Sequence, residues 1–140
     1  MVVMLDTSAV IALVERKHAG VRSAVVESGS VPSISVITLG ELHHGVESAP
    51  DGGRRRLRQL TVDACELMTV KPVSDEVARR YGQLSADVSR RIRAADRWIA
   101  ATAAIEGSLL VTFDGHLAAE LGRVQAEQEP RPVRVMLLEG

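Results

Sequence analysis

The first fourteen residues constrain the fold more than any other stretch of this chain. Residues 2–5 form a short run of strand-forming side chains without polar alternation, which is typical of a strand buried on both faces. The run ends at Asp6, and a helical apolar pattern begins after Thr7 and Ser8, one of which is expected to cap the helix. Asp6 is therefore predicted at the carboxyl end of a strand, the edge at which open α/β sheets bind ligands.

The same alternation of short strands and helices continues along the whole chain. Helical periodicity separates the apolar runs, and a polar, proline-containing loop is expected at residues 125–132. This alternation predicts an α/β fold with three layers, α/β/α, around a central, mostly parallel sheet of about five strands. The strands are expected at residues 2–5, 32–35, 67–70, 109–112 and 133–138. The helices are expected at residues 9–17, 21–27, 36–48, 54–64, 74–88, 96–106 and 117–121.

Length and composition limit the kind of protein this can be. The 140 residues are expected to form one domain, 1–140, large enough to bury roughly two-thirds of the surface of its unfolded chain. Cys65 is the single cysteine, and the sequence shows neither a leader-like segment nor a bilayer-length apolar run, so we expect a cytoplasmic protein without a membrane segment. The net charge of −1 excludes polyanion binding by overall charge, so partners must be recognised by local sites.

Four carboxylates are placed where they could meet. Asp6 and Asp114 each follow an expected strand, Glu41 lies in a helix that follows a strand, and Asp96 begins the helix that leads into the fourth strand. Two unit charges about 4 Å apart repel by roughly 4 kcal/mol at an effective dielectric constant of about 20. Four clustered carboxylates must therefore share protons or hold a cation, and an all-oxygen set favours Mg²⁺ or Mn²⁺.

Each of these acids also has a plainer interpretation. Asp6 and Asp114 could cap helices, and Asp96 could be a first-turn acid that complements a helix dipole. Glu41 could lie on a solvated helix face, although it shares a stripe with Thr38 and Gly45 that is bordered by apolar positions. The joint pattern of all four acids carries more weight than any one of them.

Four short segments resemble the acidic motifs of PIN-domain ribonucleases, and most closely those of the VapC-type toxins of bacterial type II toxin–antitoxin pairs. The segments are residues 5–9, residues 40–42 with Gly45, Asp96 followed by residues 99–103, and residues 111–114. The resemblance covers the whole chain in length, order and spacing. The fourth motif departs from the family, because residues 115–117 are Gly-His-Leu where many members carry an Asp-rich loop.

The resemblance implies a Mg²⁺-dependent or Mn²⁺-dependent endoribonuclease that cleaves RNA phosphodiester bonds with metal-activated water. Asp6 and Asp96 would bind the metal directly, while Glu41 and Asp114 would hold its waters or a second ion. The resemblance also implies a cognate antitoxin and a homodimer as partners. The side chains expected to orient the carboxylates by hydrogen bonds are Thr7, Ser8 and Thr112. The altered fourth motif supports an alternative, a degenerate PIN domain that binds RNA or protein without cleaving.

Two arginine clusters supply candidate phosphate contacts. Such clusters are more often solvated helix faces, but a neighbouring acidic metal site favours RNA binding. The first cluster lies on the cationic helix 54–64, whose inner face is expected to carry Leu57, Leu60 and Ala64. The second cluster leads directly into Asp96 and is expected to lie closer to the site. The candidate RNA contacts are Arg54, Arg58, Arg90, Arg93 and Arg97.

Overall fold

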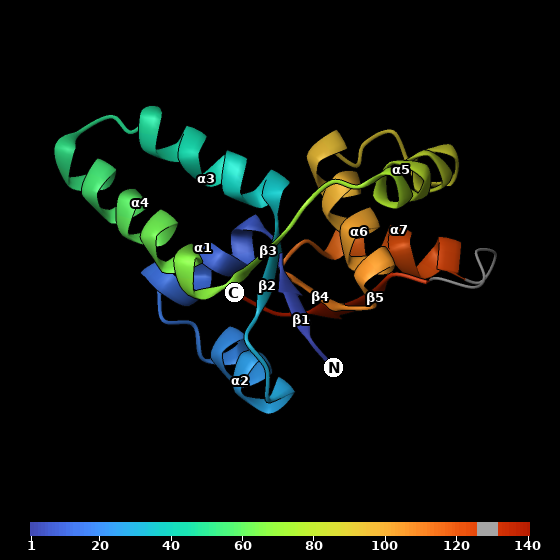
Figure 1. The fold of residues 1–140 in the computed structure, drawn as a ribbon, viewed down its shortest axis with the longest axis horizontal. Helices are drawn as coiled ribbons and strands as arrows, with labels where there is room; N and C mark the ends of the chain where they lie inside the picture. The colour runs from blue at the N-terminus through green and yellow to red at the C-terminus, as the bar shows by residue number, and fades with distance from the viewer. Residues whose placement is uncertain (126–131) are drawn as a thin grey trace.

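Five parallel strands form one sheet with the order β3-β2-β1-β4-β5 in the computed structural model, which describes residues 1–125 and 132–140 (Figure 1). Parallel strands need a crossover after each strand, and helices supply these crossovers here. The α/β class and the parallel sheet predicted from the sequence are confirmed. The strands are β1 (Val3–Leu5), β2 (Ser33–Ser35), β3 (Thr69–Lys71), β4 (Leu109–Thr112) and β5 (Arg134–Leu137).

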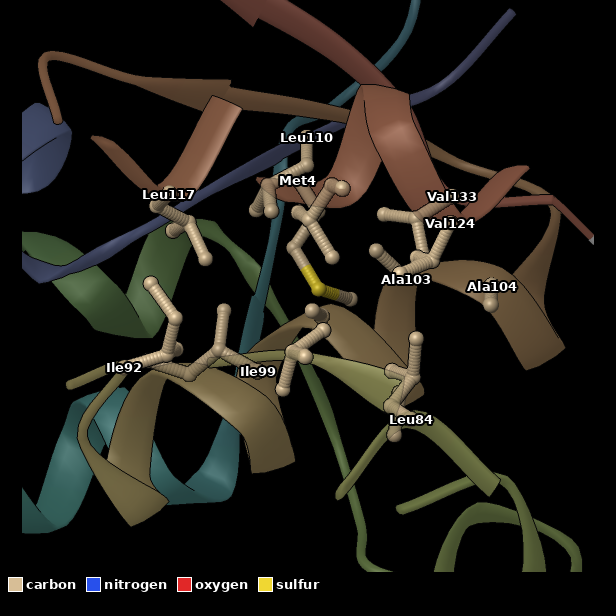
Figure 2. Packing of buried hydrophobic residues seen from close by; sticks show 14 of the residues in the cluster. Met4, Leu84, Ile92, Ile99, Ala103, Ala104, Leu110, Leu117, Val124 and Val133 are labelled. Carbon is tan, nitrogen blue, oxygen red and sulfur yellow. The ribbon is translucent and has the colours of Figure 1, made fainter. Parts of the chain in front are cut away.

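Helices cover both faces of the sheet, which gives the predicted three layers. Alternate side chains of a strand point to opposite faces, and in β1 Met4 joins one core cluster while Val3 and Leu5 join the other. Figure 2 shows Met4 and Leu110 packed against Leu84 and Ile99 in the first cluster. The helices are α1 (Thr7–Glu15), α2 (Ala19–Ser28), α3 (Val36–Glu47), α4 (Gly52–Ala64), α5 (Asp75–Asp87), α6 (Ala94–Glu106) and α7 (Gly115–Gln125), with a 3₁₀ turn, η1, at Cys65–Leu67.

The strand order reverses between β1 and β4, and this reversal positions the site. From β1 the chain builds outwards through β2 and β3, then returns to place β4 and β5 on the other side of β1. Leu5 is paired with Val111, and the N–H of Asp6 donates to the Val111 carbonyl at 3.2 Å. The carboxyl ends of β1 and β4 therefore lie side by side at the point where open α/β sheets bind ligands.

The third strand and the sixth helix begin at other residues than predicted. The third strand was expected at residues 67–70 but begins at Thr69, because Cys65–Leu67 forms a 3₁₀ turn. The sixth helix begins at Ala94, two residues before Asp96, so Asp96 lies within the first turn. Most of the loop predicted at residues 125–132 lies outside the described residues.

The predicted inner face of α4 is wrong. Leu57 and Leu60 are 43% and 60% exposed, whereas Thr61 and Val62 are buried. Two arginines of α4 bind backbone carbonyls near the end of α3 and so set the rotation of α4. Arg58 Nη1 donates to the Gly45 carbonyl at 2.7 Å, and Arg55 Nη1 donates to the Val46 carbonyl at 3.3 Å. These bonds place the arginine face against α3, so the leucines face outwards. None of the described helices is long and apolar enough to cross a membrane.

Gly107 ends α6 in a left-handed conformation (φ 66°), which L side chains adopt only at a cost. No atom lies within 4 Å of a Cβ built on Gly107 or on Gly122, which lies inside α7. We therefore expect Gly107→Ala to lower the free energy of unfolding by about 1 kcal/mol. The control Gly122→Ala should raise it by up to about 1 kcal/mol, since alanine is the better helix former. Urea unfolding of both variants checks this; equal effects would contradict the conformational explanation.

Candidate active site

Asp6 both ends β1 and caps α1. Its Oδ1 accepts hydrogen bonds from the Ala9 N–H and from Ser8 Oγ, both at 2.8 Å. The expectation that Thr7 or Ser8 caps this helix is therefore wrong, because Thr7 is already the first helical residue and Asp6 has the extended backbone of a cap. Ser8 instead holds the Asp6 carboxylate, the orienting role expected of it.

The Asp6 carboxylate is buried, and burial raises its pKa. Hydrogen bonds from Thr112, the Ala9 N–H and Ser8 oppose this rise, and the nearby negative charge of Asp96 adds to it. Asp6 and Asp96 are thus close enough to repel each other across the carboxyl end of the sheet. This repulsion is the electrostatic cost expected of clustered carboxylates.

Asp114 follows β4 in the same way that Asp6 follows β1. Its N–H donates to Thr112 Oγ1 at 3.0 Å, and its Oδ1 accepts from the His116 and Leu117 N–H groups at 3.0 and 3.1 Å. These bonds cap the start of α7. For Asp6 and Asp114 the capping interpretation is therefore correct, and it does not exclude a site, because only one oxygen of each carboxylate accepts these bonds.

Arg93 joins the two remaining acids. Its Nε and Nη2 donate to the two carboxylate oxygens of Asp96, each at 3.2 Å, and its Nη2 lies 3.5 Å from Glu41 Oε2. The bonds and the charge of Asp96, followed by the charges of Glu41 and Asp114, raise the pKa of the Arg93 guanidinium. Two of the four acids therefore bind one cation, and the charge of a third acts on it.

Glu41 is oriented from α1 rather than from its own helix. Thr7 Oγ1 donates to Glu41 Oε1 and also lies 3.3 Å from Thr38 Oγ1. Thr7 thus has the orienting role that was predicted, with Glu41 as its partner. Sequence reasoning did not assign a role to Thr38, although its place in the stripe with Glu41 was the signal that could have found it.

The donor chemistry of the site fits a hard divalent cation, because all four acids offer carboxylate oxygens. Two of them, Glu41 and Asp96, already bind the Arg93 guanidinium. Within the described ranges, no three His, Cys, Asp or Glu side chains are close enough together to hold a metal ion as they stand.

The predicted arginine contacts divide into two groups. Arg93 lies on the carboxylates, and Arg58 lines a cavity that reaches Glu41. The other three are not brought to the acids. Arg54 pairs with Asp51 at the exposed start of α4, and Arg97 lies over the Tyr81 ring at 5.6 Å. Arg90 is exposed in the turn between α5 and α6.

Comparisons with known proteins identify the family of the chain. A family model of the PIN domain matches residues 3–121. Ribonuclease VapC5 of Mycobacterium tuberculosis is 36% identical over 96 residues, which cover 66% of this chain and 71% of that protein. The crystal structure of VapBC-5, a toxin–antitoxin system of Mycobacterium tuberculosis, has a TM-score of 0.69 at 27% identity, over 99% of this chain and 98% of that chain.

A second solved structure shows that the fold is shared at lower identity. VapBC2 from Rickettsia felis, bound to a DNA fragment from its promoter, has a TM-score of 0.77 at 20% identity and covers 99% of this chain and 100% of that chain. The range matched by the family model contains all four acids, and PIN ribonucleases generally use a divalent metal. The chain belongs to the PIN-domain family and, within it, to the VapC-type ribonucleases.

Proposed function

We propose that the chain is the toxin of a type II toxin–antitoxin pair and that it cleaves RNA with Mg²⁺ or Mn²⁺ held by Asp6, Glu41, Asp96 and Asp114. The observation that carries this proposal is the Arg93 guanidinium, which Asp96 and Glu41 bind and on whose pKa the charge of Asp114 also acts. A site that holds one cation among several carboxylates has the charge and the donor atoms that a divalent ion requires.

In this proposal Asp6 and Asp96 bind the ion directly, and Glu41 and Asp114 complete its surroundings. When bound, the ion polarises a phosphoryl oxygen and lowers the pKa of the attacking water. The chain holds its carboxylates ready by hydrogen bonds: Ser8 and the Ala9 N–H orient Asp6, and Thr7 orients Glu41. Thr112 supports both Asp6 and the backbone of Asp114.

Arg93 is the arginine best placed to contact the RNA phosphate. Its side chain is 65% exposed, so it can move away from the carboxylates without disturbing the core. A guanidinium pairs with phosphate oxygens as readily as with carboxylates. We infer that Arg93 exchanges the carboxylates for the substrate phosphate when the metal binds. Arg54, Arg90 and Arg97 would contribute only to a more distant backbone path.

The expected partners are an antitoxin and a second copy of the chain. VapBC-5 and VapBC2 are toxin–antitoxin systems, which supports an antitoxin for this chain. A basic side chain of the antitoxin could pair with Asp96 and Glu41, as Arg93 does in this structure. Exposed apolar side chains on α4 and in the segment that follows it are candidates for dimer contacts, and they are Leu57, Leu60, Leu67, Val70 and Val73.

Two observations favour the alternative of a degenerate PIN domain that binds without cleaving. The described acids do not lie close enough together to hold a metal as they stand, and the fourth motif lacks the Asp-rich loop. Both functions predict a folded, antitoxin-binding protein. They differ in metal binding, which can be measured without knowing the RNA.

Calorimetric titration of Mn²⁺ into the antitoxin-free protein should show binding that Asp96→Asn weakens at least about tenfold, because the variant removes a charged ligand. Asp75→Asn is the matched control, since Asp75 is likewise a first-turn acid, at the start of α5, with a side chain that is 79% exposed. The control should bind Mn²⁺ like the parent. Absence of binding in the folded parent would overturn the nuclease mechanism and favour the binding module.

Arg93→Gln should raise the affinity for Mn²⁺ and lower RNA cleavage. The variant removes a cation that competes for Asp96 and Glu41, and exposed ion pairs of this kind are worth about 0.2–1 kcal/mol, which corresponds to an increase of up to about fivefold. The side chain makes no capping bond, so α6 should start unchanged. Arg91→Gln, an exposed neighbour, is the control. Unchanged metal affinity in Arg93→Gln would disprove the exchange.

The raised pKa of Asp6 predicts a pH-dependent stability. A raised pKa means that the folded protein binds this proton more tightly than the unfolded chain does. The protonated carboxyl therefore adds to the free energy of unfolding at low pH, and this contribution is lost as the pH rises through the folded pKa. At pH 7 and without metal, Asp6→Asn should therefore melt at a higher temperature than the parent, because asparagine keeps the cap and removes the charge.

The difference between Asp6→Asn and the parent should shrink as the pH falls through the raised pKa of Asp6, because the parent carboxyl then becomes protonated and neutral as well. Asp51→Asn is the control, because Asp51 caps α4 through an equivalent bond to the Arg54 N–H at 2.8 Å but is exposed. Its melting temperature should follow the parent at every pH. Equal stabilisation by both variants would show that burial of Asp6 is not the cause.

A further inference from the structure

A cavity of about 400 Å³ adjoins the acidic site. It lies between α1, α3 and α4, and Thr7 and Glu41 belong both to its lining and to the site. Ile11 and Leu42 supply apolar surface from α1 and α3. A volume in the range of about 300–1,000 Å³ with apolar walls and a few polar groups is typical of a small-ligand site. Whatever enters this cavity lies next to Glu41 of the acidic site.

Glu15 and Arg58 are held in this cavity by hydrogen bonds to other residues and do not pair with each other. Glu15 Oε2 accepts a hydrogen bond from Thr61 Oγ1 at 2.8 Å, and Thr61 is fully buried. Arg58 Nη1 donates to the Gly45 carbonyl at 2.7 Å. None of the ion pairs found in the described part of the chain involves Glu15 or Arg58. The cavity therefore presents an oriented acceptor and an oriented donor to a ligand.

The lining offers acceptors on Glu15 and Glu41 and donors on Arg58, so it suits a ligand group that carries both hydrogen-bond donors and acceptors. Glu15 and Glu41 disfavour a phosphate in the cavity, and Arg58 disfavours the cationic side chain of a peptide. A nucleobase is neutral and planar, and its faces suit the apolar side chains of Ile11 and Leu42. A base of RNA can therefore interact with the apolar, acidic and basic residues of the lining, whereas a basic peptide side chain pairs only with the acidic ones.

Among the four bases, guanine matches both charged groups. It carries two adjacent donors, N1–H and the N2 amino group, which a carboxylate can accept together, and two acceptors, O6 and N7, which are the usual partners of arginine. Adenine and cytosine offer one amino group each, and uracil offers a single N–H. We propose that this cavity binds a guanine next to the cleaved phosphodiester, with Glu15 accepting from its Watson–Crick edge and Arg58 donating to O6 or N7.

This proposal rests on the proposed ribonuclease function and adds its base preference. It also changes the expected role of Arg58 from a phosphate contact to a base contact. Glu15 becomes a specificity-determining residue, which sequence patterns did not single out because it lies on α1, away from the four acidic motifs.

The test maps the cleavage sites of the antitoxin-free protein on a random-sequence RNA pool with Mg²⁺. Guanine should be enriched at one fixed position beside the cut. Glu15→Gln keeps the shape of the side chain but loses its charge, and should reduce that enrichment at least about fivefold, as expected when a bidentate base contact is lost. Glu27→Gln makes the same change on the exposed side of α2 and should leave the profile unchanged. Cleavage without guanine enrichment, or with enrichment that Glu15→Gln leaves intact, would overturn the proposal.

A binding measurement separates failure of the cavity from failure of the nuclease function. In NMR titrations of the folded parent, 5′-GMP should shift the amide signals of residues around the cavity at lower concentrations than 5′-AMP does, and Glu15→Gln should abolish this difference. If no RNA is cleaved but the difference is seen, the nuclease function fails and the cavity assignment stands. If neither nucleotide binds and Glu15→Gln instead weakens antitoxin binding, the cavity is a peptide site and the guanine assignment is wrong.

Discussion

Burial of a carboxylate at one edge of the sheet is the constraint on which this site depends. Asp6 is buried with its pKa raised, and Asp96 adds to that rise from across the sheet. Carboxylates gathered in this way require a cation, and in this structure the Arg93 guanidinium provides it through Asp96 and Glu41. In the proposed function, the same negative charge that attracts Arg93 would attract a divalent metal.

Helix capping and site formation use the same residues without conflict. Asp6 and Asp114 each follow a strand and accept backbone N–H groups at the start of the next helix with one oxygen. These bonds fix the direction of each carboxylate, so the strand–turn–helix unit that builds the fold also orients the site. A sheet whose order reverses between β1 and β4 brings the two units together.

Helix α4 shows where hydrophobic periodicity gives the wrong answer. The pattern predicted Leu57 and Leu60 on the inner face, but Arg58 and its neighbour Arg55 bind carbonyl groups near the end of α3 and turn the leucines outwards. Arginine counts as a solvated residue in hydrophobic periodicity, so the periodicity cannot anticipate that its guanidinium binds the backbone of another helix. The same rotation leaves Arg58 in the cavity beside the acidic site.

The sequence by itself determined the class of the fold, the parallel sheet and the four acidic positions, because apolar runs define where strands end and parallel strands share one carboxyl edge. It also determined which helices follow those strands. Only the tertiary structure decided that β1 and β4 are neighbours, that Arg93 reaches Glu41 from 52 residues away, and that Glu15 and Arg58 face one cavity. These features depend on contacts between residues far apart in the chain, and no local pattern records such contacts.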